Sequence, residues 1–189
     1  MNSRSEMERR AGALDSEIRF CDGKSVEDGL EISLKKKSDL KERPNNALYL
    51  ILEPLSSESF QFAARERHAI VRGVLNPTYA KAMAGNKCSV ELCLSPLFGS
   101  SGLKRVRAIK DIKTNLKYAR KYGVPIVATT GATSIHDLRT PYQVFELLKV
   151  LGLTDEEAVD ATCTNPLEVI RFGKAILEKR LVSEDVIVI

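Results

Sequence analysis

Residues 123–141 read GVPIVATTGATSIHDLRTP, and the chain changes character halfway along this stretch. A short apolar run with β-branched residues, 124–128, predicts a fully buried strand. Small and hydroxyl-bearing residues follow it, and then come His136, Asp137 and Arg139. Polar groups just past the carboxyl end of a buried parallel strand are where α/β proteins usually place their sites. The stretch therefore predicts an α/β fold with a polar site at the exit of this strand.

Strands and helices alternate along most of the chain at the spacing of βα units. We expect strands at 17–20, 47–52, 69–71 and 88–94, and helices at 5–14, 25–41, 60–65, 77–84 and 103–122. The strands are apolar throughout rather than alternating, which indicates that helices cover both of their faces. The pattern predicts a parallel α/β protein, either a barrel or an open doubly wound sheet.

The pattern changes after Arg139 to a helical C-terminal third, residues 140–180. Thr140, Thr154 and Asn165 each stand where a helix N-cap is expected, with Pro or an acidic residue next and Gln or Glu three positions on. We expect three helices here, within one barrel-like domain that spans residues 1–189. Residues 185–189 are either a last short strand or a tail packed on the body.

Composition is that of an ordinary soluble protein, with 43% apolar and 29% charged residues. No apolar run approaches the length of a membrane span, and the N-terminus lacks the apolar segment of a signal peptide. The four cysteines form no CxxC pair, which favours reduced thiols and a cytoplasmic location.

Metal hydrolysis and nucleophilic catalysis are both disfavoured. The chain has two histidines, His68 and His136, and neither an HxH nor an HExxH motif. It also lacks a GxSxG elbow, and Ser134 lies too close to His136 for triad geometry. We expect no catalytic residue and no bound metal, and we expect Thr133, Ser134 and Asp137 to cap a turn.

The helix expected at 103–122 carries most of the positive charge. Between Lys104 and Tyr122 there are eight cations against one anion, a net charge of +7, so the rest of the +4 chain is acidic. The apolar residues of this helix share one arc, and its lysines fall on the opposite side. Like charges four residues apart repel each other, so such a row indicates a polyanionic partner rather than an ordinary solvated face.

Two neighbouring features support a phosphate-binding surface. Gly99, Ser100, Ser101 and Gly102 precede the basic helix, whose N-terminal amides favour an anion. Arg139 is of the residue type that holds two phosphate oxygens at once. The predicted RNA-binding residues are Lys104, Arg105, Arg107, Lys110, Lys113, Lys117, Lys121, His136 and Arg139.

These motifs, in this order, resemble a known family. A strand with a serine (VELCLSP), an Arg/Lys-rich helix, the VATT strand, LRTP at the start of a helix and NPLEVI resemble protein component 3 of archaeal ribonuclease P, a family related to the eukaryotic thirty-kilodalton subunit. The likeness covers residues 90–170 well and the upstream strands more loosely.

The resemblance implies a TIM-barrel-like fold, similar to the polymerase-histidinol-phosphatase fold without its metal ligands. It further implies a subunit of the endoribonuclease that cuts the 5′ leader from precursor tRNA, with the RNA doing the hydrolysis with Mg²⁺. The implied partners are the ribonuclease P RNA, protein component 2 and other holoenzyme proteins, with precursor tRNA contacted indirectly and no membrane involved.

The chain differs from the family at its N-terminus. Family members begin with a strand of the type FxDLxV before the first helix, whereas this sequence starts at what looks like that helix. We therefore expect an incomplete barrel, unless residues 185–189 fill the gap. Two other functions stay open. One is a barrel enzyme for a small phosphorylated substrate, with Glu91 or Glu53 as general base at a strand end. The other is an assembly protein with no RNA contact of its own.

Overall fold

The computed structural model describes residues 29–42, 47–178, 181–183 and 186–187. The helix expected at 5–14 and the strand expected at 17–20 lie outside these residues. Of the described helices, none combines the length and the apolar content that a membrane crossing requires.

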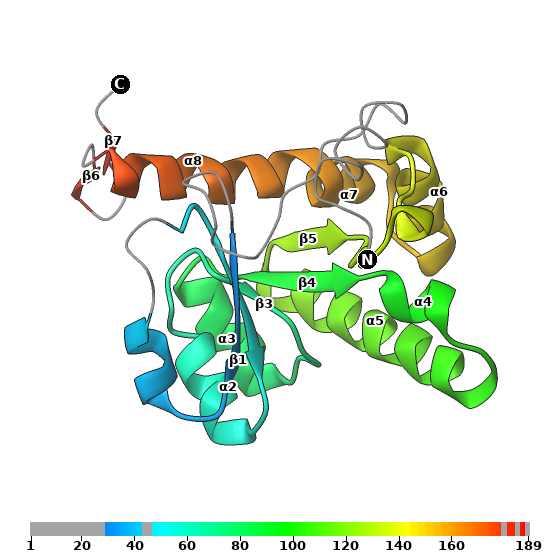
Figure 1. Cartoon of the computed structure of the whole chain (residues 1–189), viewed down its shortest axis with the longest axis horizontal. Helices are drawn as coiled ribbons and strands as arrows, with labels where there is room; N and C mark the ends of the chain where they lie inside the picture. The colour runs from blue at the N-terminus through cyan, green and yellow to red at the C-terminus, as the bar shows by residue number, and fades with distance from the viewer. Residues whose placement is uncertain (1–28, 43–46, 179–180, 184–185, 188–189) are drawn as a thin grey trace.

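Five parallel strands form the central sheet, in the order β1-β2-β3-β4-β5 (Figure 1). They are β1 (Leu30–Leu34), β2 (Leu50–Pro54), β3 (Ile70–Val71), β4 (Ser89–Cys93) and β5 (Ile126–Thr129). Each strand pairs with the next along the chain, which is the strand order of a β/α barrel rather than of a doubly wound sheet. The expectation of a barrel-like α/β fold is confirmed.

The barrel is not closed within the described residues, because β1 and β5 each have a single partner in the sheet. The short strands β6 (Leu181–Ser183) and β7 (Val186–Ile187) pair only with each other, as an antiparallel hairpin. The described part of the C-terminal segment therefore does not extend the five-stranded sheet.

One face of the sheet, which we call the outer face, is covered by α2 (Ser57–Ala63), α3 (Pro77–Gly85) and α5 (Gly102–Tyr122) (Figure 1). The central row of this face runs across the strands in register through Leu52, Val71, Val90 and Ile126. All four side chains belong to the main hydrophobic core. Burial on this face accounts for every second apolar residue of the strands, because successive side chains of a strand point to opposite faces.

The other face, which we call the inner face, packs against α8 (Asn165–Leu177), the helix that runs along the top of the view in Figure 1. Ile51, Ile70 and Val127 point to this side and form a second cluster with Val169 of α8. The helix approaches so closely that a Cβ atom at Gly173 would lie 1.7 Å from the carbonyl oxygen of Leu48. Only glycine permits that contact without a shift of backbone.

The C-terminal third is helical, as expected, and two of its three predicted caps are confirmed. Thr140 and Thr154 form capping boxes at the starts of α6 (Pro141–Leu151) and α7 (Asp155–Val159). The expected cap at Asn165 is wrong, because α7 continues through a wide π-helical turn, η3 (Asp160–Thr164), directly into α8. The Asn165 amide instead donates a hydrogen bond to the carbonyl oxygen of Ile126, 2.8 Å away, and ties α8 to β5.

Two further expectations are wrong. Residues 25–41, expected as a helix, contain β1 and the 3-10 helix η1 (Lys37–Glu42) in their described part. Leu30 and Leu34 fit both a helical and an alternating pattern, and pairing with β2 decides between them. Residues 95–102, expected as a loop, begin with the short helix α4 (Ser95–Gly99), in which Pro96 occupies an early helical position.

Candidate nucleic-acid interface

Helix α5 is held against the outer face by one buried arc of side chains. Ile112, Leu116 and Ala119 are buried there, as the helical periodicity predicts. Asn115 is buried in the same arc, and its side chain accepts a hydrogen bond from the Leu75 amide at 2.8 Å and donates one to the Gly73 carbonyl at 2.9 Å. These two hydrogen bonds fix the rotation of α5 about its axis, and therefore the direction in which its lysines point.

Opposite the buried arc lies a line of four exposed lysines, which we call the basic row: Lys110, Lys113, Lys117 and Lys121. None of the four forms an ion pair with a carboxylate in the part of the chain that the structure describes. The first and the last are eleven positions apart in the α-helix, which corresponds to about 16 Å along the axis. Lys104 and Arg107 are exposed on the first turns of the same helix.

Arg120 differs from the basic row although it belongs to the same helix. Its guanidinium donates to both carboxylate oxygens of Glu157 at 2.7 and 2.6 Å and to the Gly152 carbonyl at 2.6 Å. These hydrogen bonds between Arg120 and Glu157 lower the pKa of Glu157 and raise the pKa of Arg120. This cation joins the end of α5 to α7 and is neutralised within the molecule.

The predicted phosphate-binding loop spans the junction between α4 and α5. Gly99 ends α4, Ser101 is the N-cap of α5 without a side-chain hydrogen bond, and Gly102 opens α5 with a φ of +54°. The Ser100 hydroxyl donates to the Pro96 carbonyl, and Arg105 Nε donates to the Ser100 carbonyl at 2.8 Å. Arg105 is thereby folded back onto the loop instead of extending the basic row.

The exit of β5 forms a capped turn, η2 (Ile135–Asp137), as expected. The Asp137 carboxylate accepts hydrogen bonds from the hydroxyls and amides of Thr133 and Ser134 at 3.0 to 3.2 Å. The hydrogen bond from the Ser134 hydroxyl is the main reason that the pKa of Asp137 lies below its ordinary value. His136 is exposed on this turn.

Arg139 connects the β5 exit with the α4–α5 junction. Its guanidinium stacks on the ring of Phe98 in α4, 4.4 Å from the ring centroid, and donates to the carbonyls of His136 and Leu138 at 2.8 Å. Gly131, with a φ of +59°, lets the same exit loop approach β4, since a Cβ atom there would lie 2.5 Å from Cys93 Sγ. The structure thus brings the loop and Arg139 into one neighbourhood, at the N-terminal end of α5.

A second charged group, on the inner face, was not identified as a unit from the sequence. Arg72 donates to both oxygens of Glu91, at 2.6 and 3.1 Å, and to those of Glu31, at 2.5 and 3.2 Å. The Thr129 hydroxyl donates to Glu91 at 2.6 Å. We call these four residues the inner cluster. Its trace in the sequence is a charged residue within or directly after an apolar strand: Glu31 near the start of β1, Arg72 directly after β3 and Glu91 in the middle of β4.

The inner cluster bears on the alternative of a small-molecule enzyme. Glu91 is 3% exposed and engaged by Arg72 and Thr129, so it is a structural partner rather than a base presented to a cavity. Glu53 is half-buried and accepts a hydrogen bond from the Ser33 hydroxyl at 3.2 Å. Within the described ranges, no three His, Cys, Asp or Glu side chains are grouped as metal ligands would be.

His68, Cys88 and Cys93 have structural surroundings. His68 stacks on Phe172 of α8, with ring centroids 3.6 Å apart. Burial raises the pKa of the Cys88 thiol to about 12 and is the main cause of the raised pKa of Cys93. Cys163 is exposed.

Comparisons with known proteins agree on one family. The model of the family described as RNase P subunit p30 matches residues 26–176. Ribonuclease P protein component 3 of Methanosarcina mazei is 42% identical over 100 residues, which are 53% of this chain and 42% of that protein. The protein of the same name from Methanothermobacter thermautotrophicus is 33% identical over 96 residues, 51% of this chain and 39% of that protein. The chain therefore matches less than half the length of these relatives.

A solved structure shows the same fold. A chain in a cryo-EM structure of archaeal ribonuclease P with mature tRNA superposes with a TM-score of 0.75 at 19% sequence identity. The likeness covers all of this chain and 84% of the other. At that identity it concerns the fold alone, and it agrees with the barrel-like strand order described above.

Proposed function

The chain belongs to the RNase P subunit p30 family, and on that premise we propose that it is a protein subunit of ribonuclease P, the ribonucleoprotein that removes the 5′ leader from precursor tRNA. Its role is to bind and support the catalytic RNA. The observation that carries this proposal is the basic row, four exposed lysines on one side of α5 without an ion-pair partner among the described residues.

The cost of the basic row favours a polyanionic partner. Like charges four residues apart on a helix destabilise it by a few tenths of a kcal/mol per pair. A phosphate backbone laid along the row would remove this repulsion and release the counterions condensed on the RNA. Lys104, Arg107 and the loop of Gly99, Ser100, Ser101 and Gly102 would continue the contact toward the N-terminal end of α5. His136 and Arg139 lie on the adjoining β5 exit and add a local contact.

We further propose that the hydrolysis belongs to the RNA, with Mg²⁺ bound through the RNA. The pairing of Glu91 and Glu31 with Arg72 supports this division of labour, since these two carboxylates serve the fold. The partners are then the ribonuclease P RNA, protein component 2 and the other holoenzyme proteins, with precursor tRNA reached through the complex in the cytoplasm.

Reconstitution tests the proposal directly. The purified chain is added to ribonuclease P RNA and the remaining holoenzyme proteins, and cleavage of precursor tRNA is followed at limiting Mg²⁺. We expect cleavage to rise on addition of the chain, and a mobility shift of the RNA that weakens as salt increases. Lack of both the shift and the stimulation would refute the proposal. Metal-dependent cleavage by the protein alone, abolished by His136→Ala, would refute the assignment of the chemistry to the RNA.

A further inference from the structure

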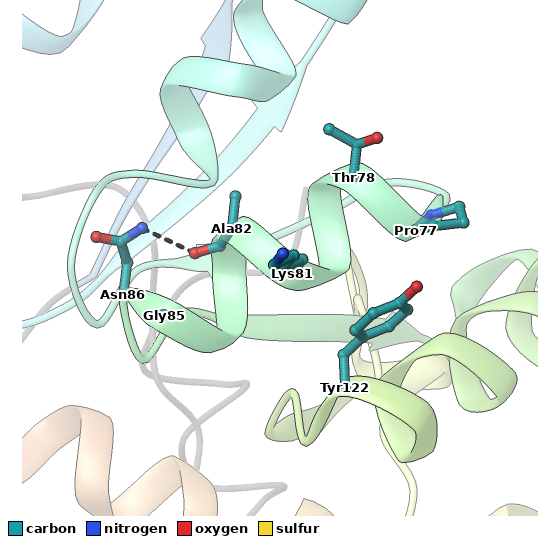
Figure 2. Close-up of a pocket in the computed structure, with 7 residues that line it drawn as sticks. All are labelled: Pro77, Thr78, Lys81, Ala82, Gly85, Asn86 and Tyr122. Carbon is teal, nitrogen blue, oxygen red and sulfur yellow. Dashed lines mark hydrogen bonds between the residues drawn. The ribbon is translucent and has the colours of Figure 1, made fainter.

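A shallow groove lies between α3 and the C-terminal end of α5 on the outer side of the molecule (Figure 2). It has a volume of about 610 Å³ and is lined by Pro77, Thr78, Lys81, Ala82, Gly85, Asn86 and Tyr122. One wall is the ring of Tyr122, whose hydroxyl points toward the first turn of α3 in Figure 2. The opposite wall is the side of α3 that carries Ala82 and Gly85, and the small size of these two residues leaves the space.

The groove adjoins the basic row. Tyr122 follows Lys121, the last lysine of the row, and Lys121 Nζ lies 5.5 Å from the centroid of the Tyr122 ring. Lys81 is exposed on the α3 side and forms no ion pair with any residue that the structure describes. The Tyr122 hydroxyl makes no hydrogen bond to another described residue. The groove thus combines an aromatic wall with two neighbouring cations, Lys81 and Lys121, that have no carboxylate partner among the described residues.

We propose that this groove holds one unpaired nucleotide of the bound RNA, with its base against the Tyr122 ring and its phosphate between Lys81 and Lys121. The inference rests on the proposed function. It specifies the feature of the RNA, an unpaired nucleotide, that would bind at the end of the basic row. Proteins recognise unpaired bases by stacking them on aromatic side chains while cations follow the backbone. A paired base cannot enter, because its faces are covered by its neighbours in the helix.

Size and charge both favour this occupant. A ligand site commonly has a volume of about 300 to 1,000 Å³, which is the range of this groove. Base stacking on an aromatic ring tolerates every base, so the groove would select for an unpaired position rather than for a sequence. Lys121 and Tyr122 are consecutive on α5, so a strand that follows the basic row to Lys121 enters the groove by turning about 100° around the helix.

The test compares two RNA hairpins that differ by one unpaired nucleotide, which is 2-aminopurine in the bulged hairpin. The full chain should bind the bulged hairpin about five- to tenfold more tightly than the paired one, and stacking should quench the 2-aminopurine fluorescence. Gly85→Leu should remove the preference by filling the groove. A side chain is tolerated there, since a Cβ atom at Gly85 meets nothing within 4 Å.

Two tyrosine variants complete the test. Tyr122→Leu should lose the preference and the quenching, and Tyr122→Phe should keep both. Tyr142→Leu is the matched control, because Tyr142 is 72% exposed on α6, away from the groove. If Tyr122→Leu fails to fold, Gly85→Leu still decides the question.

The outcomes separate this inference from the proposed function. Salt-dependent binding of both hairpins without preference, or a preference that Gly85→Leu leaves intact, would overturn the groove inference alone. Absence of binding to either hairpin at low salt would overturn both. Lys113→Ala/Lys117→Ala should bind both hairpins more weakly and still prefer the bulged one. That result would support separate contributions of the basic row and the groove to RNA affinity.

Discussion

The basic row and the inner cluster both contain cationic side chains, but their surroundings are opposite. In the inner cluster, Arg72 makes four hydrogen bonds to two carboxylates, and one of these, Glu91, has a side chain with no exposed surface. In the basic row, the four lysines are exposed to solvent and have no carboxylate partner in the described part of the chain. The charges of the inner cluster are neutralised within the fold, whereas those of the row have no carboxylate partner among the described residues, which is why we propose that they contact RNA.

Burial explains why the inner cluster must be complete. Desolvation alone would lower the pKa of Arg72, but the hydrogen bonds and charges of Glu91 and Glu31 outweigh it and raise the pKa. The guanidinium therefore remains charged at every accessible pH, and each buried carboxylate oxygen needs a donor. The cluster also joins β1, β4 and the residue after β3 across the sheet.

The largest effect is expected from breaking the inner cluster. Glu91→Ala should reduce the free energy of unfolding by about 3 to 5 kcal/mol, because it leaves the Arg72 cation half-buried and short of its main partner. Urea denaturation followed by circular dichroism measures this. Glu53→Ala is the control, since Glu53 makes a single contact with the Ser33 hydroxyl, and it should cost much less. Equal losses for the two variants would show that the cluster is no more than a set of surface charges.

Removing charge from the basic row should weaken RNA binding and change the free energy of unfolding by no more than a few tenths of a kcal/mol, in the stabilising direction. Lys113→Ala/Lys117→Ala should lower the magnitude of the log–log salt slope of RNA binding by about one to two units, because each lost phosphate contact contributes roughly 0.7 to 0.9. Arg171→Ala/Lys174→Ala removes the same charge from exposed positions on α8 and is the matched control. Equal salt slopes for the two double variants would show that the lysines of α5 do not contact RNA and that α5 is an ordinary solvent-exposed helix.

The sequence predicted the outer face and the basic row because both depend on one helical periodicity. Ile112, Leu116 and Ala119 are buried as expected, and the lysines opposite them are exposed. Asn115 was missed, although a polar residue inside an apolar arc is itself a signal. Its role depends on two backbone groups 40 and 42 residues away, Leu75 and Gly73, and no local pattern contains that information.

The inner cluster and β1 could not be derived from local patterns either. Arg72 meets Glu91 and Glu31 only because β1 to β4 lie in register, and register is a tertiary property. The same reason explains the error over residues 25–41, where a leucine spacing of four suited a helix until the partner strand was known. Asn165 was mistaken for a helix N-cap because Pro and Glu follow it as they follow a typical cap. Its side chain instead donates a hydrogen bond to the Ile126 carbonyl in β5.

Arg139 shares features with both regions, because it is held by contacts within the chain and is also a predicted RNA-binding residue. Its removal should weaken RNA binding less than removal of two lysines of the basic row. It is already positioned by Phe98 and by two backbone carbonyls, so it offers a pre-oriented cation at the β5 exit. Arg139→Ala should weaken RNA binding by about two- to tenfold, and Arg139→Lys should recover only part of that loss, because lysine lacks the planar fork. Full recovery by lysine would show that charge alone matters at this position. Filter binding at one salt concentration is sufficient.

The smallest effect concerns Arg120, the neutralised cation on the same helix as the row. Because hydrogen bonds from Arg120 hold the pKa of Glu157 below its ordinary value of 4.5, the pair stabilises the fold above about pH 4.5. That contribution is lost as the pH falls through the lowered pKa. Arg120→Ala should therefore cost about 0.2 to 1 kcal/mol at pH 7, a range for an exposed pair, and this difference from wild type should shrink below pH 4.5. Lys117 has no carboxylate partner in the described part of the chain, so Lys117→Ala should show no pH-dependent difference from wild type in thermal denaturation. If its melting temperature followed pH as that of Arg120→Ala does, the distinction between neutralised and unneutralised cations on α5 would fail.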